Sequence, residues 1–134
     1  MTNLSFRLYR NVTLKGGLLL ILAEVSLLTN DVLKLADFYK TILNTTSDGD
    51  DEIHQEILIK GAALTIYNDG TKKNNNNQNI CIAFTVENVD EEYERLKTLG
   101  AKIIEPPTTR PWGARNMHFC DPDGNHVYFR SFPN

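Results

Sequence analysis

The sequence predicts an α+β domain built from two similar β-α-β-β-β modules. The stretches 24–43, "EVSLLTNDVLKLADFYKTIL", and 81–100, "CIAFTVENVDEEYERLKTLG", can be laid over each other without a gap, and strand, helix cap and helix stay in phase. Val32 then meets Val89, and Lys40 meets Lys97. A polar stretch of low complexity, 70–79, separates the two halves. Repetition of one supersecondary pattern at a fixed offset indicates an internal duplication.

Length and composition are those of one globular domain. The chain has 134 residues, of which 41% are hydrophobic and 23% charged. The net charge of -3 argues against a nucleic-acid partner. Cys81 and Cys120 form no CxxC motif, so we expect neither a disulfide framework nor a zinc ribbon, and a reducing cytoplasm as the compartment.

The N-terminal residues 1–17 are expected to be an extension of the domain. Apolar and polar residues alternate over 5–14, as in a strand, and "KGG" then leads into an apolar strand over 18–28, so the two segments can form a hairpin. A frayed terminus is the alternative. Glu24 interrupts the apolar run, which has no cleavage site and is too short to span a bilayer. We therefore expect neither secretion nor membrane insertion.

Module one, about 18–69, contains the strand 18–28, a helix and two further strands. Asn30 or Asp31 can cap a helix over 32–43, whose buried stripe is Val32, Leu35, Tyr39 and Ile42, with Asn44 at its exit. Strand-like segments follow at 53–59 and 62–67. The stretch 70–79 is expected to be an exposed, mobile linker.

Module two, about 80–132, repeats this order. A strand over 80–88 ends at Asn88, which with Glu91 resembles a capping box for a helix that ends at Gly100. A short strand is expected at 101–107, and strands at 114–120 and 126–130 flank "DPDG". Proline second and glycine fourth in this tetrapeptide favour a type I turn.

These features resemble the vicinal oxygen chelate superfamily, which includes glyoxalases, bleomycin-resistance proteins and extradiol dioxygenases. The resemblance covers 19–131, and its most specific pieces are "ADFY" on the first helix and "PWG…DPDGN" before the last strand. It implies a curved mixed sheet around a central cavity with the helices on the outer face, and frequent homodimers. It also implies a divalent metal in many members, bound by His or Glu near the start of each module's first strand and on its last strand. Such a metal stabilises developing charge on an oxygen-bearing substrate.

The metal positions implied by the resemblance carry unsuitable residues. If the larger apolar residues of each strand face the helices, the alternate residues face the cavity. The four ligand positions then fall on Glu24, Thr65, Cys81 and Tyr128. Only Glu24 is a common ligand type at such a site. We therefore expect no conventional metal site and no cofactor; an unorthodox site of Glu24, Cys81 and His118 is the alternative.

The inferred cavity lining suits a small organic ligand. It consists of Glu24, Ser26, Thr65, Tyr67, Trp112, His118, Tyr128 and Arg130. Aromatic rings offer flat apolar area, and Arg130 can hold an anion or pair with Glu24, the one candidate for a catalytic role. Trp112 can equally be a packing anchor, His54 a surface residue and His126 a turn-flanking one.

The function expected is therefore metal-independent binding of a small molecule by a homodimer. The alternatives are a metal-dependent lyase, isomerase or dioxygenase with an atypical site, and a non-catalytic interaction module.

Overall fold

The computed structural model describes residues 21–133 of the chain. In chain order the elements are β1 (Glu24–Leu28), α2 (Val32–Ile42), β2 (His54–Ile57), β3 (Ala63–Tyr67), β4 (Cys81–Thr85), α3 (Val89–Thr98), β5 (Lys102–Thr109), β6 (Arg115–Cys120) and β7 (His126–Ser131). The strand expected over 5–14 lies outside the described residues. The strand expected over 18–28 begins only at Glu24 within them.

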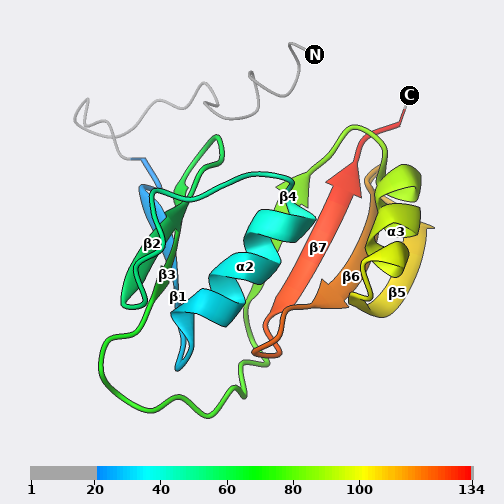
Figure 1. Ribbon diagram of the computed structural model, residues 1–134. Helices are drawn as coiled ribbons and strands as arrows, with labels where there is room; N and C mark the ends of the chain where they lie inside the picture. Colours follow the sequence, from blue (N-terminus) through cyan, green and yellow to red (C-terminus); the bar gives the residue numbers. More distant parts are fainter. Residues whose placement is uncertain (1–20, 134) are drawn as a thin grey trace, which may run out of the picture.

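Two mixed sheets confirm the two-module α+β architecture (Figure 1). The first has the order β1-β3-β2, with β1 parallel to β3; the second has the order β4-β7-β6-β5, with β4 parallel to β7. Module one is the more irregular, because the strand that should follow its helix is reduced to a single bridge between Ser47 and Ile57.

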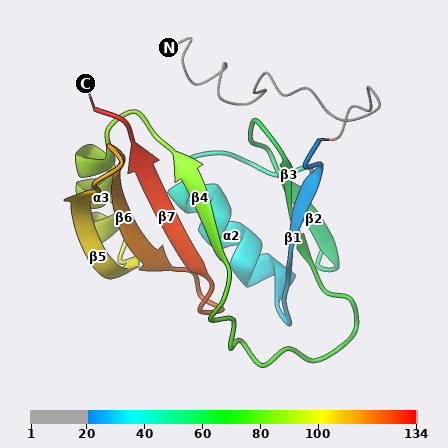
Figure 2. The ribbon, with the colours of Figure 1, turned by 180° about the vertical axis from the view of Figure 1, so that it is seen from behind.

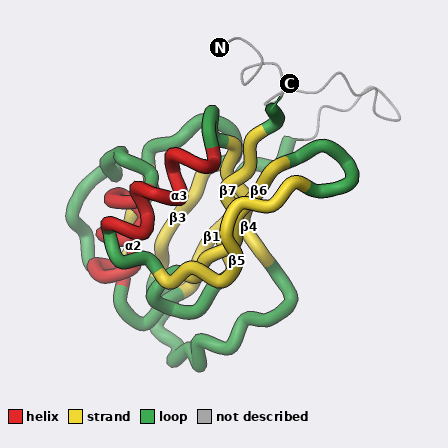
Figure 3. Tube along the Cα trace, turned by 90° about the vertical axis from the view of Figure 1, so that its right-hand side faces the viewer, coloured by secondary structure: helices red, strands yellow, loops and turns green. Residues whose placement is uncertain are grey.

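Both helices lie on the same side of the sheets. Figure 2 shows the strands in front and α2 behind them, and Figure 3 shows the two helices together on one side of the strands. The buried apolar side chains of both helices and both sheets form one core between these layers. The opposite side of the sheets, called the helix-free face below, carries no helix within the described chain.

The helix ends follow the sequence closely. Asp31, not Asn30, caps α2, and its Oδ1 accepts a hydrogen bond from the amide of Lys34 at 3.1 Å. Asn88 caps α3 through the amide of Glu91, but the Glu91 carboxylate bonds the Asn88 side chain, not the cap backbone as a capping box would. Gly100, with φ of 79°, takes the left-handed conformation that follows α3.

Helix α2 joins the two modules. The Phe38 ring lies 6.5 Å from that of Phe119, and the Tyr39 ring lies 6.5 Å from that of Phe84. The Tyr39 hydroxyl donates to Asp121 Oδ2 at 2.6 Å, with both residues buried. The packing of this helix therefore fixes module one against the second sheet. Neither α2 nor α3, the helices of residues 21–133, has the length or apolar character of a membrane span.

The "DPDG" tetrapeptide forms the expected turn between β6 and β7. The Gly124 amide donates to the Asp121 carbonyl at 2.9 Å, and Gly124 has φ of 81°. Asp121 also orders the turn through its side chain, because Oδ1 accepts from the amides of Asp123 and Asn125. The turn is thus tied to its own backbone and, through Tyr39, to α2.

Strand β5 is longer than expected. It continues through Pro106 and Pro107 to Thr109, with register shifts on either side of Glu105. Proline is tolerated here because β5 is an edge strand, where an amide hydrogen is not required on the outer side.

The stretch 70–79 is exposed but anchored. The Asn30 side chain accepts a hydrogen bond from the Lys73 amide at 2.8 Å and donates one to the Lys73 carbonyl at 2.9 Å. Asn77 Nδ2 donates to Asn125 Oδ1 at 3.4 Å, a weaker link to the turn of module two. Asn30, expected as a possible helix cap, therefore holds the linker instead.

Candidate functional site on the helix-free face

The pleat of the strands sends side chains where the alternation in the sequence predicts. In each sheet the larger apolar residues pack into or against the core: Val25, Leu27, Leu64, Ile66, Ile82, Phe84, Met117, Phe119, Val127 and Phe129. Side chains alternate along a strand, so the residues between them belong to the helix-free face. This face therefore carries Glu24, Ser26, Thr65, Tyr67, Cys81, His118, Tyr128 and Arg130.

The first sheet contributes a small polar group. The Thr65 hydroxyl donates to Glu24 Oε2 at 2.8 Å, and Ser26 is the register partner of Thr65 across β1 and β3. Two strand positions away, the Tyr67 ring meets His54 edge-on at 5.7 Å between centroids. His54 is exposed, as expected of a surface strand residue, but it shares this face.

The second sheet carries a row of side chains across all four strands. Glu105 on β5 is in register with His118 on β6, His118 with Tyr128 on β7, and Tyr128 with Ala83 on β4. The rings of His118 and Tyr128 are stacked, 4.4 Å apart and inclined by only 5°. Two flat side chains therefore stand side by side on adjacent strands.

A pair of histidines lies at the edge of this stack. His118 Nε2 and His126 Nδ1 are 2.9 Å apart and share one proton in a hydrogen bond. Burial lowers the pKa of His118, the neighbouring His126 lowers it further, and Glu105 acts in the opposite direction. The lowered pKa favours the neutral form of His118, whose ring is stacked on Tyr128.

Two arginines flank the row with different partners. Arg110 donates to Asn116 Oδ1 at 2.8 Å and forms an ion pair with Glu105. Arg130 donates from Nε to Thr85 Oγ1 at 3.2 Å. Within the described chain Glu24 and Arg130 do not pair with each other, so the salt bridge considered from the sequence is not formed.

The structure thus gathers the predicted site residues into two groups, one on each sheet. Trp112 joins neither, because it lies in the turn between β5 and β6 with 73% of its surface exposed. The sequence reasoning missed Glu105 and Arg110, and it set His126 aside as turn-flanking. Alternation along β7 does place His126 on this face, but its pairing with His118 depends on strand register.

The donor set does not fit the divalent metal that the family resemblance implies. Glu24 is engaged by Thr65 on the first sheet, whereas Tyr128 is stacked on His118 on the second. Thr65 and a neutral tyrosine are poor ligands for such an ion. In residues 21–133 no three His, Cys, Asp or Glu side chains converge into a group able to hold a metal, so Glu24, Cys81 and His118 are not brought together either.

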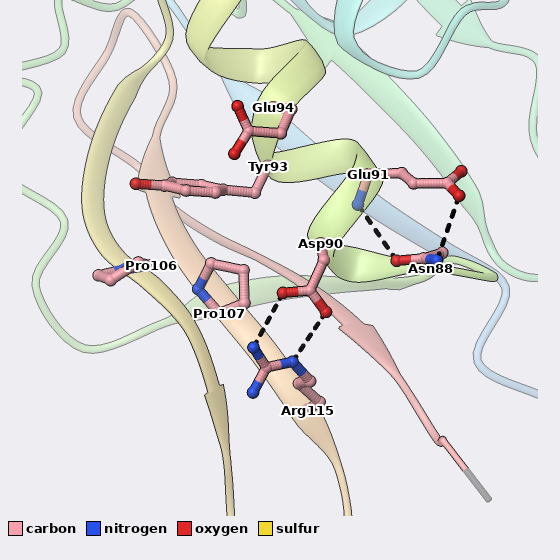
Figure 4. A pocket seen from close by; sticks show the side chains of 8 residues that line it. All are labelled: Asn88, Asp90, Glu91, Tyr93, Glu94, Pro106, Pro107 and Arg115. Carbon is pink, nitrogen blue, oxygen red and sulfur yellow. Dashed lines mark hydrogen bonds and ion pairs between the residues drawn. The ribbon is translucent and has the colours of Figure 1, made fainter.

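A first hollow, of about 520 Å³, lies outside this face, between α3 and β5 (Figure 4). Arg115 forms a two-point ion pair with Asp90 at 2.8 and 2.9 Å, and this hydrogen bonding lowers the pKa of Asp90. The Tyr93 ring and two prolines provide its apolar surface.

A second hollow, of about 340 Å³, lies between the end of β1, the linker and the turn of module two. Its lining includes Ser26 of the predicted site and Asp123. Asp123 Oδ2 is buried without a hydrogen-bond partner in the described chain, and burial raises the pKa of this carboxyl. Of the eight residues predicted to line a cavity, only Ser26 lines either hollow.

Comparison with known proteins agrees with this architecture. The family model for the glyoxalase/bleomycin resistance protein/dioxygenase superfamily matches residues 21–129. The uncharacterized protein YraH of Bacillus subtilis (strain 168) is 30% identical over 122 aligned residues, covering 79% of this chain and 94% of that protein.

Solved structures show the same fold. A glyoxalase-related enzyme from Fulvimarina pelagi superposes with a TM-score of 0.69 at 19% identity, over 81% of this chain and 86% of that one. Lactoylglutathione lyase from Agrobacterium tumefaciens superposes with a TM-score of 0.67 at 17% identity, over 81% and 91%. The chain belongs to the glyoxalase/bleomycin resistance protein/dioxygenase superfamily.

Proposed function

We propose that this member of the superfamily binds a small organic molecule on the helix-free face of its second sheet. The observation that carries the proposal is the stacked pair of His118 and Tyr128, flanked by His126 and by arginines on both sides. Flat rings with polar groups fixed around them are typical of small-molecule sites. No helix of the described chain covers this surface.

The side chains are held in place before any ligand arrives. Each of them already makes a hydrogen bond or a ring contact on the sheet, so little conformational entropy remains to be lost on binding. The proposed binding needs no metal, because the residues at the family's ligand positions do not fit one. A lyase activity like that named for the Agrobacterium protein is the competing function.

A thermal-shift screen with a library of small organic molecules tests the proposal. A ligand present at 100 times its Kd stabilises the native state by about 2.7 kcal/mol, which is a readily measured rise in Tm. We expect Tyr128→Ala to abolish that rise and the matched Tyr93→Ala, on α3, to retain it. A rise that survives Tyr128→Ala, or no rise with any compound, would contradict the proposal.

A metal assay distinguishes the proposed metal-independent binding from the competing lyase activity. Protein purified without chelator should contain no stoichiometric Zn, Ni, Mn or Fe. One equivalent of tightly held metal that is lost in Glu24→Gln would favour a metal-dependent enzyme instead.

A further inference from the structure

The outward side chains of β4 are all short. Cys81, Ala83 and Thr85 alternate with Ile82 and Phe84, which pack against the core. We call these three outward residues the β4 strip. Strand β4 is also the edge of its sheet, with β7 as its neighbour. The side chains of the strip are thus shorter than the outward side chains of the neighbouring strand β7, among them Tyr128 and Arg130.

An aromatic ring stands along one side of the strip. Ala83 is the register partner of Tyr128. One face of the Tyr128 ring is stacked on His118 of β6, and β4 lies on the other side of β7. The second face of the Tyr128 ring therefore points toward Ala83, whose methyl group is too small to cover it.

A cation stands at one end of the strip. Arg130 is the register partner of Thr85, and its Nε donates to the Thr85 hydroxyl, so the side chain leans over β4. The five ion pairs of the described chain do not include Arg130. Its guanidinium lies 5.1 Å from the Phe132 ring centroid, and its two Nη groups make no hydrogen bond within residues 21–133.

We propose that the ligand is a planar carboxylate, which lies on the β4 strip with its ring on Tyr128 and its carboxylate on Arg130. This inference rests on the proposed function and specifies its ligand. Offset stacking on a tyrosine favours a flat conjugated ring over a saturated one. The two Nη groups, which make no hydrogen bond within residues 21–133, form a fork that matches the two oxygens of a carboxylate. The first sheet offers no comparable place for an anion, because its polar group contains the carboxylate of Glu24.

Three probes of similar size separate the elements of the proposal. 2-Naphthoate has the ring and the charge, 2-naphthamide keeps the ring without the charge, and decahydro-2-naphthoate keeps the charge without the flat ring. Titrations followed by amide shifts in ¹H–¹⁵N spectra report both affinity and location. We expect 2-naphthoate to bind about 10-fold more tightly than either analogue, because each analogue lacks either the charge-assisted fork or the ring stack. This ratio corresponds to about 1.4 kcal/mol.

Variants identify the contacts. Arg130→Gln should remove the preference for the acid over the amide, and Tyr128→Leu the preference for the flat ring, whereas Tyr128→Phe should keep both. Ala83→Leu should block binding by covering the ring face. Ala63→Leu, the same change on β3 of the other sheet, is the matched control and should bind as the unaltered protein does.

The outcomes distinguish this inference from the proposed function. If ligands shift amides of the helix-free face but the three probes bind equally and Ala83→Leu has no effect, the planar carboxylate is wrong and the proposed function stands. If neither the probes nor a wider library shifts these amides, both fail.

Discussion

Removing the Tyr39 hydroxyl should destabilise the protein by about 2 kcal/mol. The hydroxyl donates a 2.6 Å hydrogen bond to Asp121 between α2 and the β6–β7 turn, and Tyr39 is 0% exposed. A hydrogen bond to a charged group contributes about 1.5–3 kcal/mol. Asp121 keeps three other donors, from Asp123 and Asn125, in the Tyr39→Phe variant. The Asp121 carboxylate therefore still has hydrogen-bond donors in this variant, so we expect a loss of stability in the lower half of that range.

Urea unfolding followed by circular dichroism measures this loss. For a domain of this length, 2 kcal/mol corresponds to a fall in Tm of roughly 8 °C. Tyr93→Phe is the matched control, because Tyr93 lies between α3 and β5 and its hydroxyl makes no hydrogen bond within the described chain. A Tyr39→Phe variant as stable as Tyr93→Phe would refute the reasoning.

The same hydrogen bond predicts a loss of stability in alkali. Burial, and then the charge of Asp121, raise the pKa of Tyr39 well above its ordinary value of 10.0. A raised folded-state pKa means that the native state favours the neutral phenol. The stabilisation is complete below about pH 10 and is lost as the pH rises above it. Tyr39→Phe should lack this component, so the stability difference from the unaltered protein should shrink above pH 10.

Three further changes test other contacts. Asp123→Asn should stabilise the protein at pH 7 by no more than about 1 kcal/mol, because Asp123 as a whole is only half-buried. Burial raises the pKa of Asp123, so the gain should vanish below about pH 4, and a gain that persists there would contradict this. His118→Gln should lose less stability than the unaltered protein between pH 7 and pH 5, as measured by urea unfolding. The reason is that the lowered pKa of His118 gives stability above pH 6.5 that is lost in acid. Equal acid sensitivity of the two proteins would contradict this prediction. Asn30→Ala should speed proteolysis and amide hydrogen exchange of residues 70–79, because both hydrogen bonds between Asn30 and Lys73 are lost. Unchanged exchange would mean that other contacts hold the linker.

Most of the fold was predictable because local patterns carry it. The stripes of α2 and α3, the capping residues Asp31 and Asn88, and the alternation in the strands are all short-range signals. The same alternation placed Glu24 and Tyr128 on the helix-free face. The single bridge that replaces a strand after α2 and the extension of β5 beyond Pro107 to Thr109 were less predictable, because pairing and edge position override local preference there.

The amino-acid sequence by itself determined the modules, the turn at 121–124 and which face of each strand is polar, since these depend on residues close together in the chain. Only the tertiary structure decided which side chains become neighbours: His118 with His126, Ala83 with Tyr128, and Tyr39 with Asp121. These pairs are set by strand register and helix docking, and a one-residue slip would replace every partner. The candidate site is a product of that register, which no local pattern specifies.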